Sequence, residues 1–309
     1  MDLVEEKLWI GGLSSALDKK LLRDHGITNI VTIDIKPLPP NGDLHYLFVP
    51  AHDVNEQDLF GCFESVFEFI EKGVKSGSVL VHCFHGVSRS ATLVISYLQK
   101  KYKISSEEGL ARLQAVRPSV LPNEGFLAQL RLYGVLMELN KMDSIVSRWY
   151  HLQQTANLHC GTPVTLPRGD VSYETTLKCR TCRYVLAYGK DVLYHRPGEN
   201  PDWKDLSWVR FALSDQQTRI DSCRQAFFVI PPPWITASSA PQGKLLCPKC
   251  RSKIGAFSWN QNQKCPCAAS YQPGFYFTPS KVDFIVNKVN QRMNHLFLRI
   301  YYFCFLHYV

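Results

Sequence analysis

The sequence predicts an α/β domain with a mostly parallel central sheet flanked by helices, followed by a small, irregular and β-rich domain. Residues 8–140 alternate short apolar runs with amphipathic segments, which is typical of strands joined by helical crossovers. Residues 177–282 show little helical periodicity and are rich in Cys, Pro and aromatic residues. A chain of 309 residues also exceeds what one hydrophobic core usually organises, so two domains are expected.

Four apolar runs predict the strands of the first domain, at residues 8–10, 27–33, 46–49 and 79–82. Before the last of these runs, apolar residues recur at helical spacing over 59–74, and Gly77 is placed to end that helix. Residues 91–98 are almost continuously apolar, which predicts a helix enclosed on most sides.

Polar residues mark the starts of two further helices. Ser105 with Glu108 forms a capping-box pattern, and Asn123 is placed to cap the next helix. Periodicity is lost after about residue 140, where Gly-Thr-Pro and Pro-Arg-Gly sequences indicate a connection. The predicted organisation is a first domain at 1–145, a linker at 146–172, a cysteine-rich domain at 173–285 and an apolar tail at 286–309.

The charge and the cysteine content indicate which partners and which cellular compartment to expect. Lys and Arg exceed Asp and Glu by 35 to 27, a net +8, which favours anionic partners such as phosphoproteins or RNA. The first residues do not resemble a signal peptide, so we expect a reducing compartment rather than secretion. The eleven cysteines are then expected to be thiols or metal ligands. The apolar run at 296–309 is too short for an ordinary membrane span, and no membrane partner is expected.

The stretch from residue 79 to residue 90 runs from a predicted strand directly into a predicted helix. Backbone N–H groups in such a turn have no helical acceptor, and together with the helix dipole they favour a bound anion. The predicted phosphate-binding loop consists of Cys83, Phe84, His85, Gly86, Val87, Ser88 and Arg89.

Two residues of this loop have chemistry suited to a phosphate ester. Cys83 lies at the base of the loop, where the same dipoles stabilise a nucleophilic thiolate. Arg89, six residues later, presents a planar fork of donors that can hold two phosphate oxygens. A buried cysteine is usually inert, but the neighbouring His, Gly and Arg favour a nucleophile here. Cys62, on a predicted helix, is expected only to pack.

The pattern HCxxGxSRS resembles the signature loop of cysteine-based protein phosphatases, especially the dual-specificity branch. The segments LWIGGLSSALDKKLLRDHGITNIVTID and RPSVLPNEGFLAQL are also similar to that family, so the resemblance covers the first 140 residues or so. It implies a two-step hydrolase without a catalytic cofactor, in which Cys83 becomes phosphorylated and water then releases phosphate.

The resemblance also implies roles for neighbouring residues. Asp53, thirty residues before the nucleophile, matches the family's general acid, with Asp58 as second candidate and helix capping as its simpler explanation. Ser90 matches a hydroxyl that assists release of the cysteine. His82 is expected to favour the thiolate, and Asn123 resembles a loop-supporting asparagine but is also explained as a helix cap.

One loop residue departs from the family pattern. His85 stands where many dual-specificity enzymes have a small residue, and HCxHG is reminiscent of cysteine-phosphatase-like RNA 5′-triphosphatases. The SRS ending, Asp53 and the NEGF segment favour the protein phosphatase, with phosphoproteins as substrates. The loop has no lysines of the kind that phosphoinositide phosphatases carry, so lipid substrates rank lower.

Paired cysteines in the second half predict two structural zinc sites, because thiolates two apart in a turn can bind one ion. The interpretation we favour places Cys247, Cys250, Cys265 and Cys267 in one site and Cys179, Cys182, Cys223 and His195 in the other. The spacing also permits an interleaved pairing, in which Cys179 and Cys182 share an ion with Cys247 and Cys250. His159 is an alternative to His195.

The segment LLCPKCRSKIGAFSW resembles the module that follows the phosphatase domain in one branch of the dual-specificity family. This resemblance implies a partner-binding domain associated with maturation of the large ribosomal subunit, in the nucleus and cytoplasm. Basic residues beside the cysteines fit contact with a pre-ribosomal particle or rRNA, although a solvated charged surface explains them equally well: Arg180, Arg183, Lys249, Arg251 and Lys253. A binding factor with dispensable catalysis is therefore an alternative.

Overall fold

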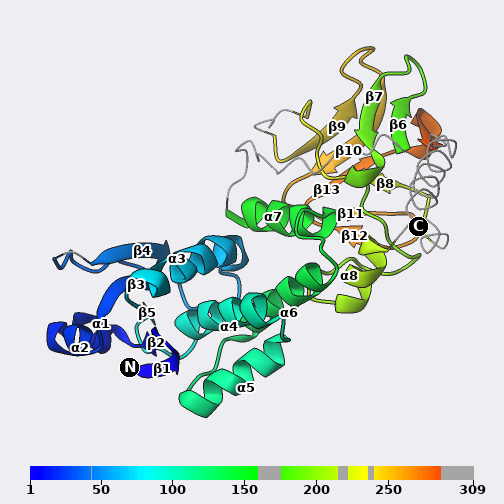
Figure 1. Cartoon of the computed structure of the whole chain (residues 1–309). Coiled ribbons are helices and arrows are strands. Elements are labelled where there is room, and N and C mark those ends of the chain that lie inside the picture. Colours follow the sequence, from blue (N-terminus) through cyan, green and yellow to red (C-terminus); the bar gives the residue numbers. More distant parts are fainter. Residues whose placement is uncertain (43, 159–174, 215–221, 236–239, 287–309) are drawn as a thin grey trace, which may run out of the picture. The chain divides into compact units, whose positions relative to one another are not determined.

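The computed structural model describes residues 1–42, 44–158, 175–214, 222–235 and 240–286 (Figure 1). The chain divides into two compact units. The first consists of Met1–Met142 with Trp203–Arg210, and the second of Asp143–Asp202 with the chain from Phe211 onward. The predicted tail lies outside the described residues except for its first residue, and so does the second half of the predicted linker, residues 159–172. The predicted domain organisation and its bounds stay a prediction.

The first unit contains a five-stranded sheet in the order β1-β2-β5-β3-β4. The four predicted strands are confirmed, and their pairings with one another are all parallel. A short strand before them, β1, adds an antiparallel edge that the apolar pattern did not show. The strands are β1 (Asp2–Glu5), β2 (Leu8–Gly11), β3 (Ile27–Asp34), β4 (His45–Pro50) and β5 (Ser78–His82).

The helices of this unit flank the sheet, as predicted (Figure 1). Helix α4 is buried along most of its length and packs against α3, α5 and α6. Gly77 ends α3, where an added Cβ would lie 2.1 Å from the Thr28 hydroxyl oxygen. The helices are α1 (Leu13–Leu17), α2 (Lys19–Asp24), α3 (Phe63–Ser76, preceded by the 3₁₀ turn Phe60–Cys62), α4 (Arg89–Tyr102), α5 (Ser106–Val116) and α6 (Glu124–Glu138).

Parallel pairing brings the carboxyl ends of the central strands to one edge of the sheet. The register aligns Thr32 of β3 with His82 of β5, and Asp34 of β3 with Pro50 of β4. The loops that leave these strands, which carry Asp53 and Cys83, therefore start beside one another. This edge is where ligands bind in open parallel sheets.

The second unit begins with a helix where a linker was expected. Residues Ile145–Leu158 form helix α7, and Val146, Trp149 and Tyr150 on it are at most 1% exposed. Their spacing of three and four residues is the helical pattern, and Trp149 packs edge-on against Tyr271. The sequence did not predict this helix within the expected linker, because its apolar repeat is short.

The rest of the second unit is β-rich, as predicted. It contains a three-stranded sheet in the order β14-β6-β7, a four-stranded sheet in the order β8-β13-β10-β9, and the pair β11-β12. The strands are β6 (Thr175–Cys179), β7 (Val185–Tyr188), β8 (Phe227–Phe228), β9 (Gln242–Leu246), β10 (Lys253–Ser258), β11 (Gln263–Lys264), β12 (Ser270–Tyr271), β13 (Gly274–Phe277) and β14 (Val282–Val286). Helix α8 (Leu206–Leu213) starts in the segment Trp203–Arg210 that belongs to the first unit. Among the helices described, none has both the length and the apolar character needed to cross a membrane.

Candidate active site and metal centres

Cys83 lies directly after β5, at the base of the loop that leads into α4, and its side chain is buried. The Gly86 backbone N–H donates a hydrogen bond to its sulfur at 3.2 Å, and the Ser90 hydroxyl lies 3.2 Å from the same atom. Gly86 has φ +73°, and an added Cβ would lie 2.5 Å from the Gly11 carbonyl oxygen. Only glycine fits this tight turn beside the sulfur.

The carbonyl groups of the loop point outward, toward the surrounding protein. Those of Phe84 and Val87 accept hydrogen bonds from the backbone N–H groups of Leu13 and Leu121, each at 3.0 Å. Arg117 donates to the two carbonyls between them, from Nη2 to His85 at 3.0 Å and from Nε to Gly86 at 2.8 Å. In a trans peptide the next N–H points the opposite way, so the amides of residues 85–88 face the inside of the loop. This ring of N–H groups is suited to an oxyanion.

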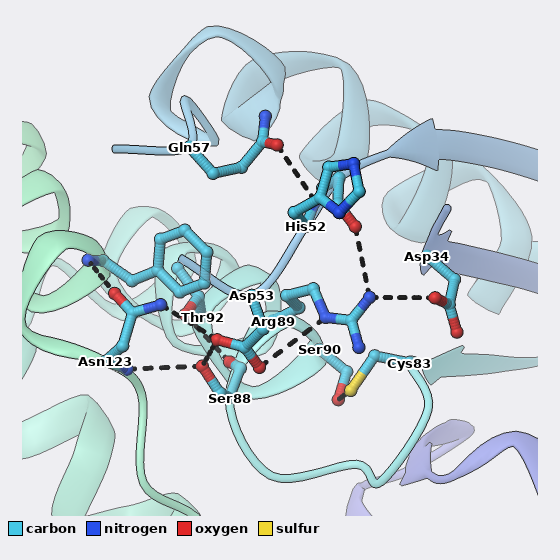
Figure 2. A network of polar contacts seen from close by, with 12 residues as sticks. Asp34, His52, Asp53, Gln57, Cys83, Ser88, Arg89, Ser90, Thr92 and Asn123 are labelled. Atoms are coloured by element: carbon cyan, nitrogen blue, oxygen red, sulfur yellow. Dashed lines mark hydrogen bonds and ion pairs between the residues drawn. The ribbon is translucent and has the colours of Figure 1, made fainter. Parts of the chain in front are cut away.

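Arg89 is held so that part of its guanidinium remains available for a ligand. Its Nη1 donates to Asp34 Oδ1 at 2.9 Å and to the Ala51 carbonyl at 3.1 Å (Figure 2). Its Nε is buried and finds no hydrogen-bond acceptor in the described part of the chain. A buried donor without a hydrogen bond is costly, and a phosphoryl oxygen would satisfy it.

Asp53 lies over this loop, with its two oxygens in different surroundings. Oδ1 accepts hydrogen bonds from the Ser88 hydroxyl at 2.7 Å and from Asn123 Nδ2 at 2.9 Å. Oδ2 lies 3.6 Å from Arg89 Nε (Figure 2). The side chain is about one-third exposed, as a group that meets a substrate must be. Because Oδ1 is occupied as an acceptor, Oδ2 is the oxygen free to carry a proton.

His82 contacts the backbone of Cys83 rather than its sulfur. Nδ1 lies 3.2 Å from the Cys83 carbonyl oxygen and Nε2 lies 2.9 Å from Thr32 Oγ1. A carbonyl only accepts, so Nδ1 carries the proton. Burial lowers the pKa of His82, which keeps the ring neutral at neutral pH. The expected help to a thiolate therefore cannot be that of a fixed positive charge.

The remaining predicted residues differ in their contacts. Asn123 caps α6, accepting from Phe126 N–H at 3.0 Å, so both expectations for it hold structurally. Asp58 caps a turn through Gly61 N–H at 3.2 Å, as in its simpler explanation. Cys62 Sγ donates to the Leu59 carbonyl, and burial raises the thiol pKa to about 12, in agreement with a packing role. His85 is exposed on the loop.

Comparison with known proteins identifies the family. Residues 8–135 match the family model described as dual specificity phosphatase, catalytic domain. Dual specificity protein phosphatase 12 of Rattus norvegicus is 32% identical over 91% of this chain and 87% of its own length. The chain belongs to the dual-specificity protein phosphatases. Dual specificity protein phosphatase MPK-4 of Drosophila melanogaster is 31% identical over 92% of this chain and 87% of its own. Tyrosine-protein phosphatase yvh1 of Schizosaccharomyces pombe is 28% identical over 91% and 83%.

The second unit of this dual-specificity phosphatase contains two clusters of side chains that could hold a metal ion. Within each, the ligand atoms lie at most 4.8 Å from one another. The eight predicted residues are all used, but the favoured pairing is wrong and the interleaved alternative is confirmed. The clusters are Cys179 with Cys182, Cys247 and Cys250, and His195 with Cys223, Cys265 and Cys267. Spacing along the chain favoured local pairs, whereas folding brings the first cysteine turn onto the second.

The spacing of the sulfurs fits a tetrahedral ion. The Sγ distances are 3.7 Å for Cys179–Cys250, 3.5 Å for Cys182–Cys247 and 3.7 Å for Cys223–Cys265. A tetrahedron with zinc–sulfur bonds of about 2.3 Å has sulfur–sulfur edges of about 3.8 Å. None of the nine cysteines in the described residues forms a disulfide; Cys160 and Cys304 lie outside these residues.

His195 has the tautomer that a metal ligand needs. The Tyr271 hydroxyl donates to the Leu193 carbonyl at 3.2 Å, so its oxygen accepts from His195 Nδ1 at 3.0 Å. Nε2 is then unprotonated, and it is buried without a hydrogen-bond partner in the described residues. A bound cation would satisfy this orphan atom. His159, the alternative ligand, lies outside the described residues.

Two residues of the active site, Asp34 and Arg117, were missed by sequence reasoning, and Ser88 was predicted only as part of the loop. Asp34 and Ser88 orient Arg89 and Asp53, and Arg117 turns two loop carbonyls outward. Arg117 and Ser88 stand in segments whose resemblance to the family was recognised, although no role followed from it. Asp34 ends a strand at the functional edge of the sheet, which was the available signal.

Proposed function

We propose that this phosphatase hydrolyses phosphotyrosine and phosphoserine or phosphothreonine in proteins through a phosphocysteine. In the first step the Cys83 thiolate attacks phosphorus, and the bond from phosphorus to the leaving oxygen breaks. Asp53 gives the proton on Oδ2 to that oxygen. Arg89 Nε and the inward-facing loop amides hold the phosphoryl oxygens. The buried Nε of Arg89, which finds no hydrogen-bond acceptor among the described residues, is the observation that carries this proposal.

In the second step water attacks the phosphocysteine, and its proton passes to the Asp53 carboxylate. The sulfur–phosphorus bond breaks, inorganic phosphate leaves, and the thiolate is restored. Ser90, whose hydroxyl lies 3.2 Å from the sulfur, donates a hydrogen bond to the departing thiolate. No metal or cofactor is needed for either step in this scheme, since every proton is accounted for by Asp53.

The test compares variants of the full chain on phosphotyrosine and phosphothreonine peptides and on 5′-triphosphorylated RNA. Cys83→Ser should abolish turnover of both peptides, and Asp53→Asn should lower it by about 10²- to 10⁴-fold. Peptide turnover that is unaffected by Cys83→Ser would refute the proposal. Faster release of phosphate from the RNA, with little dependence on Asp53, would instead favour an RNA 5′-triphosphatase.

We further propose that the two clusters bind structural zinc, one ion each, and that the cysteine-rich unit binds pre-ribosomal particles of the large subunit in the nucleus and cytoplasm. Thiolate and imidazole ligands in tetrahedral spacing are what zinc favours, and four protein ligands leave no open position for catalysis. Lys249, Arg251 and Lys253 are exposed beside the cysteines, which suits an anionic partner.

Co-sedimentation with pre-ribosomal particles, together with immunofluorescence, tests this second role. The full chain and its Cys83→Ser variant should both sediment with the particles, because the proposed binding does not require catalysis. Absence of the zinc-loaded wild-type chain from those fractions would contradict it.

A further inference from the structure

Basic residues occur without carboxylates along one continuous stretch of the cysteine-rich unit. Residues 222–282 include seven Lys and Arg and no Asp or Glu, so this stretch accounts for +7 of the net charge of +8. The seven cysteines of the two clusters, as thiolates with two divalent ions, would contribute a formal charge of −3. The seven Lys and Arg side chains would still leave an excess of positive charge. Segregated positive charge of this kind attracts polyanions.

A cavity of about 430 Å³ lies within this stretch, between strand β9 and the second cysteine turn. Its volume is within the range of small-ligand pockets, about 300 to 1,000 Å³. Its walls combine the aromatic rings of Trp234 and Phe257 with the basic side chains of Lys244 and Arg251, and none of its lining residues is acidic. We call it the Lys244–Arg251 cavity.

Arg251 is a free charge in an unusual backbone position. It follows Cys-Pro-Lys-Cys with φ 63°, as Arg183 follows Cys-Arg-Thr-Cys with φ 62°. The Arg183 guanidinium pairs with Asp283, whereas that of Arg251 has no ion pair in the described part of the chain. A left-handed conformation costs a non-glycine residue roughly 1–2 kcal/mol, which glycine would avoid. Arg251 therefore contributes a charge that the turn itself does not require.

Two further residues of the cavity wall differ in character, because Trp234 is held in place and Lys244 is exposed to solvent. Trp234 donates from Nε1 to the Leu186 carbonyl at 2.7 Å and stacks on Phe277 with an interplanar angle of 12°. Lys244 lies on β9, the edge strand of its sheet, next to the buried Leu245 and therefore on the opposite face. A fixed, half-buried indole beside two cations that form no ion pair with the described residues is suited to a base and its phosphates.

We propose that the Lys244–Arg251 cavity binds single-stranded RNA, with one unstacked base against Trp234 and neighbouring phosphates at Lys244 and Arg251. Single strands are favoured over duplexes because only unpaired bases can enter and stack on a side chain. The aromatic walls favour RNA over an acidic peptide, which would use only the cations. This inference rests on the proposed binding of RNA-containing particles and locates the contact.

The two cysteine turns supply a matched pair of variants. Arg251→Gly and Arg183→Gly both remove an arginine from a left-handed position, so neither should strain its turn. Binding of a fluorescein-labelled oligouridylate to the full, zinc-loaded chain is followed by anisotropy at several salt concentrations. We expect Arg251→Gly to raise Kd at least about tenfold, for one lost charge-assisted contact. It should also lower the slope of log affinity against log salt by about 0.7, while Arg183→Gly matches the wild type.

Equal affinities of the two variants would overturn the cavity as the RNA site, and so would tighter binding of labelled polyglutamate than of RNA. Lys244→Ala provides a second variant, on a different element, which should weaken RNA binding in the same way. Absence of RNA binding by the wild type would also overturn the proposal. If the wild-type chain still co-sediments with pre-ribosomal particles in that case, the broader proposed function survives and only the RNA site fails.

Discussion

Arg89 lies between the carboxylates of Asp34 and Asp53, and the relative strength of these two ion pairs determines where its guanidinium is held. Asp34 holds Nη1 at 2.9 Å, while Asp53 Oδ2 lies 3.6 Å from Nε. The Asp34 pair is the shorter and more buried of the two, so it keeps Arg89 from closing onto the proposed general acid. Asp34 is thus a positioning residue, acting through Arg89.

Asp34→Asn should lower kcat/KM by about 10- to 100-fold, the equivalent of one lost charge-assisted hydrogen bond. Most of the loss should fall on kcat, because Arg89 would then pair with Asp53 and disturb proton transfer. Steady-state kinetics on an aryl phosphate measure both parameters. Glu108→Gln, which removes a surface ion pair with Arg112, is the control and should leave kinetics unchanged. Wild-type kcat in Asp34→Asn would remove this role.

His82 makes stability depend on pH in a defined direction. Its folded pKa lies below the unfolded value of about 6.5, so below that pH the unfolded chain gains a proton that the native state resists. The free energy of unfolding should therefore fall as pH decreases from about 6.5, by up to about 1.4 kcal/mol per pH unit. Urea unfolding at pH 7.0 to 5.5 should show a shallower decline for His82→Gln, and parallel declines would contradict it.

At the scale of elements, two helix starts have the same local geometry but different surroundings. Ser105 caps α5 by accepting from Glu108 N–H at 3.1 Å, and Asn123 caps α6 in the same manner. Asn123 alone also donates to Asp53. Through Asn123, the start of α6 therefore holds the Asp53 side chain in place over the phosphate-binding loop.

Ser105→Ala and Asn123→Ala should each cost about 1 kcal/mol of stability, but only the second should slow turnover. Asn123→Asp separates the two effects, because aspartate retains the cap yet cannot donate to the Asp53 carboxylate. It should keep near wild-type stability and lose activity. Denaturant midpoints and kcat of the three variants provide the test; full activity of Asn123→Asp would show that the cap alone matters.

Most elements of the first unit were predictable because they have strong local signals. The four apolar runs became strands, and the run at 91–98 became the buried centre of α4. Strand β1 and helix α7 were missed, since their apolar repeats are short and gain stability only from the partners they pack against. In the site, Cys83 and Arg89 follow from loop spacing, whereas Asp34 reaches Arg89 only through the register of the sheet.

At the scale of the whole molecule, the grouping of the proposed metal ligands brings together segments that are distant in the sequence. Cys179 and Cys247 lie in one cluster although 68 positions separate them, so an ion bound there would close a long loop. Sequence spacing alone cannot choose this pairing, because both alternatives satisfy the same local turns. The fold decides it by bringing two similar cysteine turns face to face.

Metal analysis of double variants distinguishes the pairings. Cys179→Ser with Cys247→Ser should remove one zinc ion per chain and leave the second, because both residues belong to one cluster. Cys179→Ser with Cys265→Ser should remove both ions and serves as the comparison. Loss of both ions in the first double variant would indicate the pairing of neighbours along the chain.

The most direct test of the catalytic account is to trap the phosphoenzyme. Ser90→Ala should slow its hydrolysis, so rapid quenching after mixing with an aryl phosphate should show a burst of product that approaches one per chain. Peptide mass spectrometry should then find the phosphoryl group on Cys83. Sustained turnover of wild type and variant with phosphate on another residue, or with none bound to Cys83, would contradict the account.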